Sequence, residues 1–154
     1  MRNLILLLLL VIAAPSSARA DLGIGIFVGE PLGLDLKIDL QRRQALDIVL
    51  GVSSIRDGGR DYSYGHLTYM VTPFVGRGRT VLVPVRFGIG AAMAGLVEGD
   101  VNIAARAPFE VALLFRRAPM EIYGQVALVL RLVRENENAD LLDTDGGVGL
   151  RIYF

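Results

Sequence analysis

Apolar and polar residues alternate strictly along most of this chain. The pattern is clearest between residues 32 and 40, where every second residue is Leu or Ile and the positions between them are Gly, Asp or Lys. Side chains of a β-strand point alternately to two opposite faces. A period of two therefore predicts strands that have one apolar face and one polar face.

Eight such segments follow one another along the chain, at residues 22–29, 32–40, 45–53, 66–73, 81–93, 106–115, 120–132 and 147–154. Charged residues interrupt every apolar run after the first twenty residues, so no segment resembles a transmembrane helix. Eight is the smallest even strand number found in transmembrane barrels. We therefore predict an all-β fold, an eight-stranded antiparallel up-and-down transmembrane β-barrel. Pro84 and Pro108 have no amide hydrogen for the sheet, so we expect bulges or strand starts there.

Charge separates the two faces of the predicted strands. An Arg or Lys on the lipid face costs about 2–4 kcal/mol at mid-membrane, so the charged face must point inward. The interior of an eight-stranded barrel is filled by side chains, and buried charges persist when they are paired. The sequence thus predicts a plugged lumen and not an open pore, with a charge network of five acids and five bases, Asp35, Lys37, Asp39, Asp47, Arg86, Arg106, Glu110, Glu121, Arg131 and Arg151.

The amino terminus has the features of a secretory signal. A short positive start precedes an apolar run of about a dozen residues, and Ala18-Arg19-Ala20 provides a small-x-small cleavage pattern. We predict a cleaved signal peptide at residues 1–20 and one barrel domain at residues 21–154. The chain contains no Cys, which excludes a lipid-anchored lipoprotein, disulfides, thiolate metal sites and thiol catalysis.

The connections between segments differ in length and charge. Those after the second, fourth and sixth segments are short and basic, whereas those after the third, fifth and seventh are longer and mostly acidic. Short turns on the periplasmic side and long loops outside are typical of outer-membrane barrels. Phe74, Phe115 and Phe154 all fall at the turn end, where an aromatic girdle is expected. We expect the basic turns to contact anionic headgroups or assembly factors, and not nucleic acid.

The carboxy-terminal segment resembles the signature by which outer-membrane barrels are recognised for insertion. Val148, Leu150, Ile152 and Phe154 form its apolar face, and the chain ends on the aromatic residue. With the segments 28–33, 83–90 and 106–110, the chain resembles a family of small bacterial outer-membrane β-barrel proteins, similar in size to the OmpA transmembrane domain and OmpX. The resemblance implies an integral eight-stranded barrel. We expect it to be a monomer in the bacterial outer membrane that contacts lipids and, during insertion, the barrel-assembly machinery. It implies no reaction and no cofactor.

Two groups of residues are candidates for chemistry. His66 lies near Asp61, Ser63 and Ser53 at the predicted outer rim, and these are the residue types of barrel acyltransferases and proteases. The acidic stretch at residues 135–145 contains carboxylates that a divalent cation would favour, although it lacks the spacing of a calcium loop. We interpret His66 as a polar rim residue and the acidic stretch as a solvated loop, with no catalytic, cofactor-binding or metal-binding role for either.

The function expected from the sequence is structural or surface-interacting, through the longer extracellular loops, with an extracellular partner that the sequence does not identify. Two alternatives stay open. One is an outer-membrane lipid-modifying enzyme that uses His66. The other is a soluble, lipocalin-like ligand-binding barrel with its faces exchanged, so that the apolar face would point inward.

Overall fold

The structure is a computed structural model that describes residues 22–54, 61–97, 99, 101–133 and 141–154. The predicted signal peptide at residues 1–20 therefore lies outside the described residues. Most acidic positions of the longer connections also lie outside them, since residues 55–60, 98, 100 and 134–140 are not described. Within the described parts, no helix is both long and apolar enough to cross a membrane.

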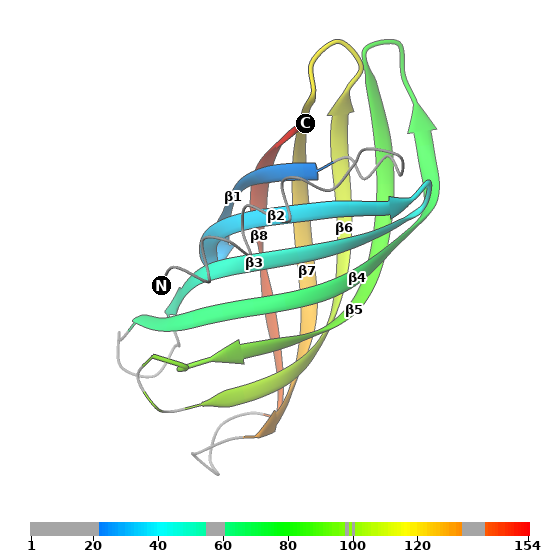
Figure 1. Cartoon of the computed structure of the whole chain (residues 1–154). Coiled ribbons are helices and arrows are strands. Elements are labelled where there is room, and N and C mark those ends of the chain that lie inside the picture. Colours follow the sequence, from blue (N-terminus) through cyan, green and yellow to red (C-terminus); the bar gives the residue numbers. More distant parts are fainter. Residues whose placement is uncertain (1–21, 55–60, 98, 100, 134–140) are drawn as a thin grey trace.

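Eight antiparallel strands close into a single barrel in sequence order (Figure 1). The barrel closes where the first strand pairs with the last, with Ile24 opposite Ile152. The predicted all-β, eight-stranded, up-and-down barrel is thus confirmed as an architecture. The strands are β1 (Leu22–Glu30), β2 (Leu32–Gln41), β3 (Gln44–Ser54), β4 (Asp61–Arg77), β5 (Val81–Ala94), β6 (Asn102–Phe115), β7 (Met120–Val133) and β8 (Leu142–Tyr153).

Three strands are longer than their apolar pattern predicts. β4, β6 and β8 each begin four or five residues earlier than expected, on the side of the longer connections. The ladder there pairs Ser54 with Asp61 and Ala94 with Asn102. Backbone hydrogen bonds form irrespective of side-chain polarity, so the sheet continues past the alternating stretch. As a result, residues predicted at the rim lie deeper in the barrel.

Burial alternates along the strands as the period of two requires. In β2, Leu34 is 67% exposed on the outer face, while the next residue, Asp35, is 1% exposed in the lumen. Small inward residues make room for large ones. A Cβ on Gly149 would lie 2.2 Å from Cζ of Tyr123, so this β8 position accepts only glycine opposite the tyrosine ring. Tyr123 stacks on Phe27 with ring centroids 5.9 Å apart.

The expected irregularity is found beside Pro84 and not at Pro108. Pro84 is the fourth residue of β5 and Pro108 the seventh of β6, and the register between these strands does not shift at either position. Neither proline belongs to a β5–β6 residue pair, because proline has no N–H to donate to the neighbouring strand. A register shift does lie next to Pro84 in the β4–β5 pair, where Val71 pairs with Phe87 but Phe74 pairs with Val85.

Candidate functional site

The lumen gathers the charged residues that the alternating pattern assigned to the inner face. Asp39 and Arg131 lie near the two ends, with side chains 31% and 24% exposed. The others are buried, with at most 4% of each residue exposed, and come from six of the eight strands: Asp35, Lys37, Asp47, Arg86, Arg106, Glu110, Glu121 and Arg151.

Arg151 of β8 is the centre of this network. Its Nε lies 2.6 Å from Oδ2 of Asp35, and its Nη2 lies 2.7 Å from Oδ1 of Asp47. Its Nη1 lies 2.9 Å from Oε1 of Glu121 and 3.3 Å from Oε2 of Glu110. The guanidinium also lies over the ring of Tyr123, 3.7 Å from its centroid. A single side chain therefore ties together strands β2, β3, β6, β7 and β8.

Arg86 of β5 completes the inner cluster from the other side of the two glutamates. Its Nη2 donates to Oε2 of Glu121 at 2.6 Å, and its Nη1 donates to Oε1 of Glu121 at 2.9 Å and to Glu110. The two glutamates are thus shared between Arg86 and Arg151. Charged pairs of this kind, fully desolvated, are costly to break because the remaining partner has no water to replace the lost contact.

A second layer of polar contacts lies toward the longer connections. Arg106 donates from Nη2 to Oε1 of Gln125 at 3.0 Å, and its Nη1 lies 2.7 Å from Nε2 of His66. A guanidinium only donates, so Nε2 of His66 accepts and the proton of a neutral ring sits on Nδ1. That Nδ1 lies 3.3 Å from the hydroxyl of Tyr64. His66 is therefore a buried link in the lumen network.

This geometry corrects the sequence-based placement of His66. The residue is 4% exposed and lies inside the lumen, not at the rim, because β4 already begins at Asp61. The two serines named with His66 in the sequence form other contacts. Ser53 donates to Oε2 of Glu30 at 3.0 Å, and Oγ of Ser63 accepts from the amide of Val97 at 3.0 Å. Neither of these two contacts involves His66.

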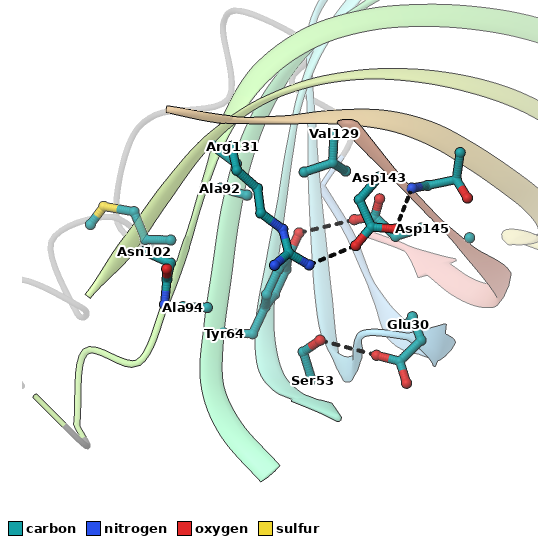
Figure 2. A pocket seen from close by; sticks show the side chains of 14 residues that line it. Glu30, Ser53, Tyr64, Ala92, Ala94, Asn102, Val129, Arg131, Asp143 and Asp145 are labelled. Atoms are coloured by element: carbon teal, nitrogen blue, oxygen red, sulfur yellow. Dashed lines mark hydrogen bonds and ion pairs between the residues drawn. The ribbon is translucent and has the colours of Figure 1, made fainter. Parts of the chain in front are cut away.

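A pocket of about 460 Å³ opens above this layer, at the end of the barrel with the longer connections (Figure 2). Figure 2 shows Arg131 reaching across the pocket to Asp143, with Nη2 and Oδ2 2.6 Å apart. Tyr64 donates to Oδ2 of Asp145 at 3.3 Å, so the described carboxylates on this wall already have protein partners.

Only part of the candidate cation site lies among the described residues. Residues 134–140 of the acidic stretch lie outside the described residues, and Asp143 and Asp145 pair with Arg131 and Tyr64 as above. Among the described residues, no three His, Asp or Glu side chains are grouped so that they could hold a metal ion.

The carboxy-terminal signature residues occupy the outer face of the closing strand. Val148 is 59%, Ile152 46% and Phe154 77% exposed, and the amide of Phe154 donates to the carbonyl of Leu22 at 2.9 Å. Their alternation with buried Gly149 and Arg151 places the last strand in the same two-faced arrangement as the rest.

Comparison of the chain with protein-family models, curated proteins and solved structures finds no match. The family resemblance expected from the sequence therefore stays a prediction, and a function must be argued from the geometry.

Proposed function

We propose that the protein is an integral protein of the bacterial outer membrane with a closed lumen. The supporting observation is the inverted distribution of polarity between the two barrel faces. Large apolar side chains are exposed on every strand, for example Ile26, Leu34, Leu50, Leu67, Ile89, Val111, Val126 and Val148. A continuous apolar belt of this kind far exceeds the patches that soluble monomers expose, whereas lipid tails would cover it.

The charged interior supports the same proposal. A lipocalin-like barrel in water would have its apolar face inward, around a ligand, and its charges outside. Here Arg151 and Glu121 are fully buried, while Ile89 is 69% exposed. Phe74 and Phe154, 62% and 77% exposed, lie at the turn end where a lipid interface would favour aromatic rings. The geometry therefore favours a membrane barrel over the soluble, lipocalin-like alternative.

The filled lumen supports a structural or surface-interacting role and not conduction. Across the middle of the barrel Arg151 is joined to the four carboxylates of Asp35, Asp47, Glu110 and Glu121, so paired charged side chains occupy the lumen there. We infer that contacts with other molecules are made at the barrel ends, with the longer connections facing outside the cell. We propose no catalytic function. Nδ1 of His66 lies 3.3 Å from the hydroxyl of Tyr64, but with Nε2 facing Arg106 this nitrogen carries the proton and is not the base that a nucleophile requires.

The first experiment is gel migration of the outer-membrane fraction with and without boiling in detergent. A folded membrane barrel resists cold detergent and migrates differently from its boiled form, so we expect a heat-dependent shift in that fraction. Recovery of the chain in the soluble periplasmic fraction, without a shift, would contradict membrane insertion.

A second experiment tests the closed lumen. The purified barrel is inserted into a planar bilayer and its conductance is compared with that of a porin. We expect no steady, porin-sized conductance, because the lumen is crossed by paired charges. Steady, ohmic conductance of that size would contradict a filled barrel while leaving membrane insertion intact.

A further inference from the structure

The barrel mouth at the turn end is surrounded by arginines from all three short turns. Arg42 and Arg43 lie between β2 and β3, Arg77 closes β4, and Arg116 and Arg117 lie between β6 and β7. Figure 1 shows the β4–β5 and β6–β7 turns standing together at the top of the barrel. These five side chains are exposed, and all five line one cavity of about 1300 Å³ in the mouth.

The charge of this cavity is strongly unbalanced. Its floor contains two further cations, but both are already paired: Lys37 lies 2.9 Å from Asp39, and Arg86 is held by Glu110 and Glu121. Asp39 is the acidic residue of the lining. Within the described part of the chain, the five mouth arginines form no ion pair.

Unpaired like charges gathered in a concave site repel one another and attract a counter-ion. A low-dielectric wall focuses their field into the cavity, and opposite charge within about 10 Å is attracted at ordinary salt. The opposite end differs, since its pocket is lined by Glu30, Asp143 and Asp145 with Arg131 as its base. Among the described residues, one opening of the barrel is therefore cationic, and the charged side chains that line the pocket at the other are mainly acidic.

Arginine chemistry narrows the class of anion. The planar guanidinium forms paired hydrogen bonds with phosphate and carboxylate, and five of them on three turns require a ligand with several anionic groups. The cavity exceeds the usual range of about 300–1,000 Å³ for a drug-sized ligand. The lumen residues Lys37, Arg86 and Tyr153 belong to its lining, so the cavity continues into the end of the barrel, whereas lipid headgroups surround a barrel from its sides. We propose that this mouth binds a soluble polyanion that carries two or more phosphate groups.

The test uses the folded full barrel in an uncharged detergent and tripolyphosphate as the probe. Calorimetry at low salt is expected to show binding that weakens as salt is raised, because each contacted charge releases counter-ions. Replacing Arg42, Arg116 and Arg117 together by Gln is expected to weaken binding by at least about tenfold, since charge-assisted hydrogen bonds are lost. These residues are exposed on turns, so the variant should keep its heat-dependent gel shift.

The matched control is Arg131→Gln at the opposite end, which is expected to leave binding unchanged. No heat with tripolyphosphate at low salt, or an equal loss in Arg131→Gln, would overturn the proposal.

A final arm distinguishes a soluble ligand from a lipid headgroup. The barrel in vesicles of zwitterionic lipid is expected to bind tripolyphosphate as it does in detergent. If the mouth arginines were needed only for association with vesicles containing anionic lipid, and tripolyphosphate did not bind, the ligand would be a headgroup and the proposal would be wrong.

Discussion

The lumen and the outer surface of this barrel are built from the same strands but follow opposite rules. In β6, Phe109 is 39% exposed on the outer face and Glu110, its neighbour, is completely buried in the lumen. Each outer residue interacts with whatever surrounds the barrel, while each inner residue depends on named partners in other strands. The comparison predicts that a substitution in the lumen changes stability by removing a partner of another side chain. A substitution on the outer face should change stability according to whether lipid or water surrounds the barrel.

The largest expected effect is at the centre of the lumen. Arg151→Met would leave Asp35 and Asp47 without an arginine partner, while Glu110 and Glu121 would keep Arg86 alone. We expect a loss of about 3–5 kcal/mol in the free energy of unfolding, because removing one partner of a buried ion pair leaves uncompensated charge. Urea unfolding in lipid vesicles, followed by the gel shift, measures it. Arg117→Met on an exposed turn is the control and should change stability by less than about 0.5 kcal/mol. Equal stability of the two variants would contradict the central role of Arg151.

The next effect tests what surrounds the outer face. Val126 is 62% exposed near the middle of β7. Val126→Arg is expected to cost about 2–4 kcal/mol in vesicles, because the charge would enter the apolar part of the bilayer. Leu132→Arg, near the end of the same strand, should cost only about 0–1 kcal/mol. If Val126→Arg were as harmless as an ordinary surface substitution, the outer face would be facing water.

A smaller effect is expected for a single hydrogen bond of the lumen. The hydroxyl of Tyr123 donates to Oδ2 of Asp35, which also accepts from Arg151. Tyr123→Phe should lower the free energy of unfolding by about 1–3 kcal/mol, since a buried acceptor loses a donor. Tyr69→Phe, on the outer face, is the matched control and should be close to neutral. A neutral Tyr123→Phe would show that Arg151 alone satisfies the carboxylate.

The smallest effect is expected where the lumen opens to solvent. Arg131 and Asp143 are 2.6 Å apart, but their side chains are 24% and 41% exposed. Arg131→Ala should therefore cost no more than about 1 kcal/mol, because water replaces the lost partner. The same urea series measures it, and a loss as large as that of Arg151→Met would mean that depth in the lumen does not control the strength of a pair.

The inner face could be read from the sequence because alternation is a local property. Leu34 and Asp35 are neighbours in the chain, and the pleat of a strand alone sends them to opposite sides. The partners of each charge could not be read in this way. Arg151 meets Asp35 at a sequence separation of 116 residues, and that contact depends on how the strands are staggered when the barrel closes.

His66 shows the same limit in the candidate site. Its nearness to Ser63 in the sequence suggested a shared rim site, but alternation and the early start of β4 send the imidazole down to Arg106 and Tyr64. The arginines of the turn-end mouth are visible in the sequence as three separate basic turns. Only the closed barrel places them around one cavity.

The sequence by itself determined the number of strands and their two faces, because both follow from a period of two. It also predicted the charged interior, on the expectation that the apolar face meets lipid. The tertiary structure decided which acids meet which bases, where β4 bulges, and that one mouth is cationic. These depend on stagger and closure, which bring distant residues together and leave no trace in local periodicity.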